Sequence, residues 1–330
     1  MSFFATKRIF LLIMCILCTC YVQKPYAQLS PAISQYSFNA FLLNPAAAGS
    51  EGYTTINLTA RRQWICIPGA PETVSIDFQT RIYKRVFIPS TASVRKKYVK
   101  PQRSGRVGLG CSFINDRHGA FDQKGLKLSY AYHVPGNRSQ LSFGLALSML
   151  LYKINYNEMV PETEHDDLLN NGQNKFFVPD FDAGIYYTNQ HLFAGISVKN
   201  LTRMAKNLNF YPYEGYQQRI ISIIGGYQFK LSESVGLEPS FYVKNAGLFF
   251  MQTDLNVKLA FKDILWSGVT YRSPGTMCFQ GGFRLNRVYI GYAYEYNLFM
   301  RHEFCFSTHE LMVAAKLGDN VRRYKWLERY

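Results

Sequence analysis

The side chains in this chain that could perform chemistry are six histidines, seven cysteines and one short acidic run. A hydrolytic enzyme needs a nucleophile, a base and a group that orients the base. No Gly-x-Ser-x-Gly motif occurs, and the histidines show no recognisable catalytic spacing; they are His118, His133, His165, His191, His302 and His309. We therefore predict that the protein is not an enzyme.

Metal binding is also not expected from the residue pattern. The acidic run from Glu162 to Asp167 offers carboxylate oxygens, which Ca²⁺ prefers, but it lacks the ligand spacing and glycine of an EF-hand loop. We interpret it as a solvated loop. No cysteine and histidine spacing is typical of zinc sites, and spacing alone pairs none of the four cysteines beyond the N-terminal region, which are Cys66, Cys111, Cys278 and Cys305. We predict no metal and no cofactor.

Residues 1–27 have the pattern of a secretory signal peptide. Two basic residues precede an apolar stretch from Ile9 to Val22, and the small residue Ala27 precedes polar Gln28. The stretch is too short for a membrane-spanning helix, which needs about 20 residues. The alternatives are a buried N-terminal helix and a lipoprotein signal, but residues 17–20 lack the usual small residue before a modified cysteine. We expect export with cleavage of this signal peptide, at a position that stays open.

The chain is basic, with a formal net charge of +15. A basic protein can bind nucleic acid, but here the basic residues are scattered singly, apart from one cluster from Arg95 to Arg103. We interpret the cluster as a solvated loop, whose charge could also meet the phosphates of outer-membrane lipids. Nucleic acid is not an expected partner of an exported chain.

Apolar and polar residues alternate along most of the remaining chain. Between Arg287 and Asn297, even-numbered positions such as Tyr292 are apolar, and odd-numbered positions include Gly291 and Glu295. Successive side chains of a strand point to opposite faces. The least regular segment contains Trp266, which takes the opposite phase to its apolar neighbours. The pattern predicts strands at about 53–64, 73–84, 104–114, 124–134, 139–151, 179–188, 191–200, 218–230, 234–245, 250–261, 263–272, 276–286, 287–297 and 308–318.

Three features favour a transmembrane barrel over a water-soluble sandwich, which also alternates. Charged residues occur mid-strand on the polar face, which suits a hydrated lumen; aromatic residues, 16% of the chain, gather toward strand ends; and many segments have about ten residues, as tilted spanning strands require. An even number of strands can close without a free edge. We predict an all-β, antiparallel transmembrane β-barrel of about 14 strands over residues 53–330, preceded by an N-terminal periplasmic segment at 28–52.

Two joins between the predicted strands are long, Val86 to Arg103 and Lys153 to Val178. Membrane barrels have short periplasmic turns and longer outer loops. We therefore expect both joins to face outward or to fold into the lumen.

Motifs near the N-terminus resemble those of a known family. Residues 34–39 (Ser-Gln-Tyr-Ser-Phe-Asn) precede residues 43–50 (Leu-Asn-Pro-Ala-Ala-Ala-Gly-Ser), and residues 62–64 and 69–73 follow at the spacing of that family. In these motifs the chain resembles the PorP/SprF family, outer-membrane proteins of the type IX secretion system of Bacteroidetes. The resemblance covers nearly the whole mature chain; it departs where Ala47 replaces a common aromatic residue and at Cys66-Ile67-Pro68.

The resemblance implies a role in protein secretion. It implies a barrel of the cell outer membrane that docks to periplasmic ring, lipoprotein and motor components and supports the export or surface anchoring of secreted cargo such as gliding adhesins. Since Asn-Pro favours turn initiation and glycine permits positive φ, residues 44–50 look like a shaped turn. We hypothesise that this segment plugs or orders the barrel mouth and presents a docking edge; a simple turn is the alternative. The candidate partner-binding residues are Gln35, Asn39, Asn44, Pro45, Gly49, Gln63, Trp64, Gly69 and Pro71.

A passive diffusion porin is the second candidate function. About fourteen strands lie between filled eight-stranded and open sixteen-stranded barrels, so size allows either a plugged barrel or a porin. Steady conductance would identify a porin, whereas a plugged platform should conduct little. A rim enzyme is a third candidate, which only esterase or protease turnover would support.

Overall fold

The computed structural model describes residues 33–82, 106–155, 175–202, 219–246, 250–273, 275–298 and 307–318. The predicted signal peptide, the basic cluster 95–103 and the acidic run 162–167 lie outside the described residues.

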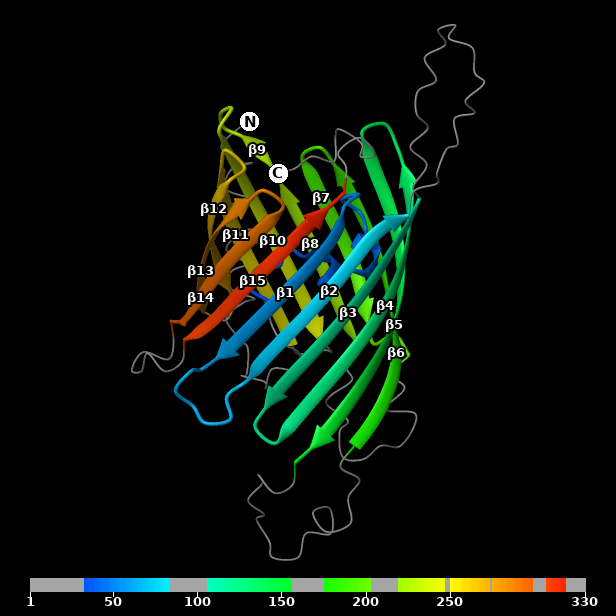
Figure 1. Cartoon of the computed structure of the whole chain (residues 1–330), viewed down its shortest axis with the longest axis vertical. Coiled ribbons are helices and arrows are strands. Elements are labelled where there is room, and N and C mark those ends of the chain that lie inside the picture. The colour runs from blue at the N-terminus through cyan, green and yellow to red at the C-terminus, as the bar shows by residue number, and fades with distance from the viewer. Residues whose placement is uncertain are drawn as a thin grey trace, which may run out of the picture.

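The described chain forms a closed antiparallel β-barrel of tilted strands (Figure 1). The strands are β1 Thr54–Gln63, β2 Glu72–Ile82, β3 Val107–His118, β4 Phe121–Pro135, β5 Ser139–Ile154, β6 Lys175–Asn189, β7 Leu192–Lys199, β8 Ile220–Tyr227, β9 Phe229–Lys230, β10 Val235–Ala246, β11 Phe250–Phe261, β12 Leu265–Arg272, β13 Thr276–Leu285, β14 Val288–Asn297 and β15 Thr308–Leu317. Strands pair with their neighbours in sequence, and β1 pairs with β15, which closes the sheet. The prediction of a barrel of about 14 strands is confirmed.

Strands β8 and β9 are one barrel strand with an interruption at Gln228. β8 pairs with β10 from Ser240 onward, and β9 pairs with Gly236 and Leu237, so the register places Glu238 opposite the interruption and Pro239 next to it. Proline has no backbone N–H to donate to a ladder, and sheets accommodate it at edges and irregularities. The irregularity beside Pro239 divides one barrel strand into β8 and β9, so fifteen assigned strands form a fourteen-stranded barrel.

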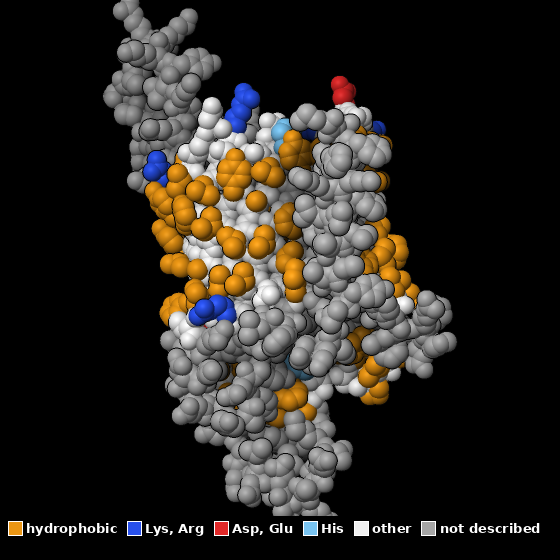
Figure 2. All heavy atoms as spheres, turned by 180° about the vertical axis from the view of Figure 1, so that it is seen from behind, with side chains coloured by type: hydrophobic (Ala, Val, Ile, Leu, Met, Phe, Trp, Pro, Cys, Tyr) orange, Lys and Arg blue, Asp and Glu red, His pale blue; other side chains and the backbone are white. Residues whose placement is uncertain are grey.

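The apolar face of the strands points outward and the polar face points into the lumen. Leu145 and Phe177 are 63% and 55% exposed, whereas Asp77 and Asp254 are fully buried. Figure 2 shows hydrophobic side chains over the wall as seen from behind. This arrangement is the reverse of a water-soluble protein, because lipid rather than water is the outer solvent.

Three predicted strands extend further in the structure than the alternation indicated. The predicted strands ended at 114 and resumed at 124, but β3 and β4 continue to a two-residue turn at Gly119-Ala120, where Gly119 has φ 55°. β6 begins at residue 175 rather than 179. The added residues of the β3–β4 hairpin are mostly polar, so alternation of apolar side chains could not reveal them.

The two ends of the barrel differ in the length of their connections. At one end, here called the short-turn end, five joins have two to four residues; they follow β4, β6, β9, β11 and β13. The opposite end, the long-connection end, carries joins of up to 20 residues, which follow β5 and β7. The long β2–β3 join leaves the short-turn end and the β5–β6 join leaves the other. The two joins therefore cannot both face outward, because β2 and β5 run in opposite directions; the alternative that they fold into the lumen concerns residues outside the described ones.

Candidate functional site

Residues 33–50, here called the lumen segment, run inside the barrel before β1 begins (Figure 1). The segment contains the short helix α2 (Ala40–Leu43) and the 3₁₀ helix η1 (Pro45–Ala47). Phe41 is 1% exposed and Ala46 is fully buried. Within the described residues, no helix has the length and apolar character needed to cross a membrane. The wall of the barrel therefore surrounds residues that had been expected on the periplasmic side of it.

Asn44 joins the lumen segment to two strands at once. Its side-chain N–H groups donate to the backbone carbonyls of Ile185 on β6 (2.9 Å) and Ile196 on β7 (3.1 Å). Its Oδ1 accepts from the backbone N–H of Ala46 at 2.9 Å, which caps η1. Only an amide can donate and accept in this way, so the geometry explains why asparagine precedes Pro45.

Four inward-facing glycines on the wall provide room for the lumen segment. A Cβ added to Gly144 would lie 2.2 Å from the backbone nitrogen of Ala46, and one added to Gly108 would lie 2.0 Å from the carbonyl oxygen of Ala48. Equivalent atoms on Gly184 and Gly291 would lie 2.1 Å and 2.3 Å from side-chain oxygens of the segment. The absence of a side chain at these positions thus sets how closely the segment packs on the wall.

Hydrophobic residues of the lumen segment pack in an apolar cluster inside a mainly polar lumen. Tyr36 and Leu43 contact a buried cluster that includes Phe193 and Tyr242. The Tyr36 hydroxyl lies 3.5 Å from Ser240 Oγ, and burial raises the pKa of that hydroxyl above its ordinary value. The side chain is thus neutral and acts as a packing group.

Buried cations lie over the other aromatic rings of the segment. Lys258 Nζ is 4.4 Å from the centroid of the Phe38 ring, and Lys127 Nζ is 5.1 Å from that of Phe41. Phe38 also packs against Trp266, with ring centroids 4.3 Å apart. Trp266 is the residue whose phase did not fit its predicted strand, and it points inward because its partner is the lumen segment.

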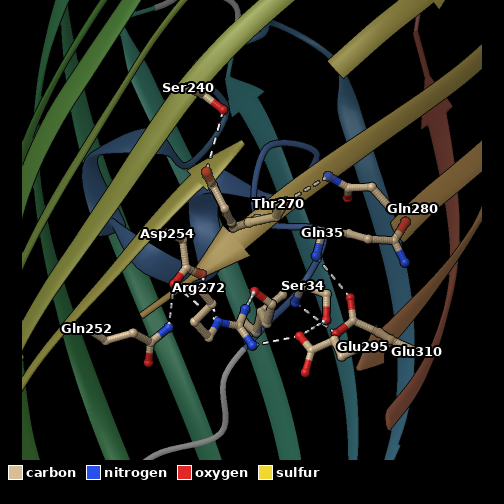
Figure 3. Close-up of polar contacts among 12 residues, drawn as sticks. Ser34, Gln35, Ser240, Gln252, Asp254, Thr270, Arg272, Gln280, Glu295 and Glu310 are labelled. Atoms are coloured by element: carbon tan, nitrogen blue, oxygen red, sulfur yellow. Dashed lines mark hydrogen bonds and ion pairs between the residues drawn. The ribbon is translucent and has the colours of Figure 1, made fainter. Parts of the chain in front are cut away.

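The start of the lumen segment is held by charged side chains. The Glu310 carboxylate accepts from the backbone N–H groups of Ser34 (2.9 Å) and Gln35 (3.1 Å). Ser34 Oγ donates to Glu295 at 2.7 Å (Figure 3). Arg272 donates to the carbonyl oxygen of Ile33 at 3.2 Å. One carboxylate therefore binds two consecutive backbone donors, a charge-assisted contact stronger than a neutral one.

These side chains belong to a network that we call the charged clamp, formed by Arg61, Asp254, Arg272, Glu295 and Glu310. Arg61 pairs with Glu295 at 2.6 Å and with Glu310 at 3.1 Å. Arg272 pairs with Glu295 at 2.6 Å and with Asp254 at 3.0 Å. The side chains are at most 9% exposed, so their mutual pairing offsets the loss of hydration.

The end of the lumen segment is held by neutral polar groups near the short-turn end. The Gly49 N–H donates to Gln79 Oε1 at 3.0 Å, and Gly49 has φ 66°. His133 Nε2 lies 3.0 Å from the carbonyl oxygen of Ala48. The prediction that Gly49 takes a positive φ is confirmed. His133, on the inward face of β4, thus contacts the segment.

The segment does not fill the lumen completely. A pocket remains between it and the wall, lined on the segment side by Phe38 and Phe41 and on the wall side by Tyr186, Phe193 and Glu238. The barrel is therefore partly closed by its own chain. Among the described residues, no group of histidine, cysteine, aspartate and glutamate side chains is arranged to hold a metal ion.

The structure separates the candidate partner-binding residues into two groups. Five of them belong to the lumen segment and are buried against the wall: Gln35, Asn39, Asn44, Pro45 and Gly49. The other four lie at the β1–β2 turn of the long-connection end: Gln63, Trp64, Gly69 and Pro71. Gln63 is also buried, at 4% exposure. Gln35 lies beside Glu310, which is opposite Arg61 near the end of β1 that carries Gln63, whereas Gly49 contacts Gln79 near the other end of β1. The lumen-segment residues face inward along the strand and do not form one continuous edge with the turn.

The β1–β2 turn, residues 64–71, is held in place at both ends. The Gln63 N–H donates to the Pro71 carbonyl at 2.9 Å, and the Gly119 N–H of the neighbouring turn donates to the Gly69 carbonyl at 2.7 Å. Trp64 has φ 48°, an uncommon conformation for a bulky residue that surrounding contacts must maintain. At the tip, Ile65 and Ile67 are 39% and 37% exposed. The turn is therefore an ordered, partly apolar projection.

A family model described as the type IX secretion system membrane protein PorP/SprF matches residues 26–315. The match covers the lumen segment and almost the whole barrel. The chain belongs to the PorP/SprF family. This family is described as a membrane component of a secretion system and not as a family of enzymes. The fold is a closed antiparallel β-barrel with an apolar outer wall.

Solved structures show only distant likeness to this PorP/SprF protein. The outer membrane protein Omp33 of Acinetobacter baumannii has 5% sequence identity and a TM-score of 0.44, with 81% of this chain and all of that chain covered. A mutant porin of Rhodopseudomonas blastica has 8% identity and a TM-score of 0.33, covering 80% of this chain and 99% of the porin. No curated protein matches the sequence.

The clamp residues of this PorP/SprF protein were not singled out from the sequence. They come from five strands between residues 61 and 310, so no local motif contains them. One signal was available, because charged residues of both signs occur mid-strand on the polar face. That pattern predicts a polar lumen, but it does not say which charges meet.

Proposed function

We propose that this PorP/SprF protein is an outer-membrane barrel that acts as a docking platform of the type IX secretion system. In this proposal it binds periplasmic ring, lipoprotein or motor components and supports the export or surface anchoring of secreted cargo such as adhesins. The observation that carries the proposal is the lumen segment, which occupies the interior and is bonded to the wall along its length. A passive diffusion porin would need that space for solute.

Conductance in planar bilayers distinguishes the platform from the porin. We expect the wild-type protein to conduct little, because the lumen segment obstructs the pore. A variant lacking residues 33–50 should insert and conduct steadily, because the segment that obstructs the lumen is then absent. Steady wild-type conductance equal to that of the deletion variant would instead establish a porin.

Loop lengths support an orientation for the two ends. Short turns face the periplasm in outer-membrane barrels, so we propose that the short-turn end meets periplasmic components. The β1–β2 turn would then face outward and receive secreted cargo or a surface partner. Its ordered backbone and exposed isoleucines suit a docking surface, since little conformational entropy remains to be lost on binding.

Paired variants test docking at each end. Ile65→Ser with Ile67→Ser removes the apolar tip of the β1–β2 turn, and Leu231→Ser with Ile264→Ser removes two exposed apolar residues from turns at the short-turn end. We expect the first pair to lose cargo and the second to lose periplasmic components on pull-down from solubilised outer membrane. Both variants should still insert and keep the lumen segment protected. Retention of every partner by both variants would contradict docking through these turns.

A further inference from the structure

A row of charged side chains runs along the outside of the barrel at the long-connection end. The strand registers place its members opposite one another on neighbouring strands, in the order Arg62, Glu72, Arg117, Asp122, Lys153 and Lys175. None of the six side chains is buried. The row spans β1 to β6 and forms the rim of the apolar outer wall on this side.

The charges in this row alternate at first and then fail to alternate. Arg62 pairs with Glu72 at 3.1 Å, and Asp122 follows Arg117 in the row. Lys153 and Lys175 then lie directly opposite each other. Like charges in directly opposite positions destabilise a sheet. Within the described residues, neither lysine forms an ion pair, and Asp122, which lies opposite Lys153, is the one carboxylate beside three lysines, so this part of the rim carries net positive charge.

On the same strands, apolar side chains lie next to the charged row on the side away from the rim. Leu151 and Phe177 lie opposite each other, two residues from Lys153 and Lys175, and they are 38% and 55% exposed. Lys124 lies opposite Leu151 on β4, and its Nζ is 3.9 Å from the Asp122 carboxylate. A two-residue step along a strand is about 7 Å. The lysines are therefore separated from the apolar surface by a distance comparable with the size of a lipid headgroup.

We propose that Lys153 and Lys175, assisted by Lys124, bind the anionic phosphate headgroup of a membrane lipid whose acyl chain lies against Leu151 and Phe177. The phosphate reduces the repulsion between the two opposing lysines. Contact of the acyl chain with Leu151 and Phe177 adds to the attraction between the headgroup and the two opposing lysines. The site requires the barrel to lie in a membrane and does not depend on which secretion partners it binds.

Native mass spectrometry of bound lipid tests the proposal. Wild-type protein is equilibrated with vesicles of equimolar phosphatidylcholine and phosphatidylglycerol, and the retained lipid is identified after extraction in mild detergent. We expect retained phosphatidylglycerol and its loss by about thirtyfold in Lys153→Gln with Lys175→Gln, from the electrostatic contribution of two basic residues near an anionic surface. Equal retention by this variant and the wild type would overturn the proposal.

Matched variants separate charge at this site from charge in general. Lys230→Gln with Lys262→Gln removes two exposed lysines from the short-turn end and should retain phosphatidylglycerol as the wild type does. Lys153→Arg with Lys175→Arg should also retain it. Inorganic phosphate should not displace the lipid, because it lacks acyl chains. Displacement by inorganic phosphate, or equal loss in the two lysine-to-glutamine pairs, would contradict a specific lipid site.

The acidic run 162–167 belongs to the β5–β6 connection, which joins the strands that carry Lys153 and Lys175. Its carboxylates are the alternative partner of these lysines, and the experiment must distinguish them from lipid. Replacing Glu162, Glu164, Asp166 and Asp167 by their amides should leave lipid retention within about twofold of the wild type if lipid binds the lysines. A large gain of lipid in this variant, with little bound to the wild type, would assign the lysines to the acidic run and overturn the proposal.

Discussion

The two ends of the lumen segment are attached to the same barrel by different physical means. Residues 33–35 are held by the charged clamp, in which carboxylates accept from backbone N–H groups. Residues 44–49 are held by close packing on wall glycines and by neutral hydrogen bonds. Charged contacts are strong but tolerate small displacements, whereas packing against glycine fails as soon as a side chain is added.

This difference indicates that the two parts of the segment have different structural roles. Packing at Asn44 and Ala46 defines one position of the segment relative to the wall. The Ala46 backbone lies against Gly144 and the Asn44 side chain against Gly184, with no room for a Cβ atom at either glycine. The clamp adds attachment at the start of the segment, where the described chain begins. Substitutions in the two regions should therefore differ in size and in how far their effects spread.

The largest effect is expected from Glu295→Gln in the charged clamp. Glu295 pairs with both Arg61 and Arg272, so its loss leaves two buried guanidinium groups with fewer partners. Removing one partner of a buried ion pair costs about 3–5 kcal/mol. Hydrogen exchange should show loss of protection at residues 33–35 and a smaller loss at 44–48.

The control for this variant is Glu72→Gln, which also removes a carboxylate that pairs with arginine but on the outer surface. Its partner Arg62 is 60% exposed. Equal loss of protection in the two variants would show that burial of the clamp does not strengthen the attachment of residues 33–35.

The next largest effect is expected from Gly144→Val. The added side chain would overlap the backbone of Ala46, which cannot turn away as a flexible side chain can. Overpacking of this kind costs about 1–3 kcal/mol, and the whole of residues 44–48 should become exchangeable. Gly281→Val is the control, since a Cβ there would have its nearest neighbour at 3.5 Å, an ordinary contact. Unchanged protection of residues 44–48 in Gly144→Val would rule out packing as their attachment.

A smaller effect is expected from Asn44→Ser. Serine can still cap η1, but it cannot donate to the carbonyls of Ile185 and Ile196. Two lost hydrogen bonds amount to about 1–2 kcal/mol. Exchange should increase at residues 43–47, while the clamp end stays protected. Loss of protection at residues 33–35 as well would mean that the two ends are coupled and not separate attachments.

The smallest effect is expected from Arg62→Gln on the outer rim. The Arg62 and Glu72 side chains are 60% and 54% exposed, so solvent screens their attraction. Exposed ion pairs contribute less than about 1 kcal/mol. Denaturant unfolding in vesicles should give nearly the wild-type midpoint, and the lumen segment should remain fully protected. A shift as large as that of Glu295→Gln would remove the distinction between inner and outer charge pairs.

The alternation of side chains predicted most of the barrel wall. The strands from Arg287 to Asn297 and elsewhere were placed within a few residues, because lipid outside and polar groups inside impose a period of two on every spanning strand. Prediction was less accurate where a strand leaves that environment, as at residues 115–124, or where an inward position has a special neighbour, as at Trp266.

The sequence alone determined the fold class, the approximate strands and a distinctive N-terminal motif, since these depend on local periodicity and adjacent residues. Only the tertiary structure decided that Asn44 and Gly49 face the wall from within the barrel, while Trp64 and Gly69 lie at its far end. It also decided that Arg61 meets Glu295 across 234 residues of sequence. Closure of the sheet brings such residues together, and no local pattern records which distant strands will face each other across the lumen.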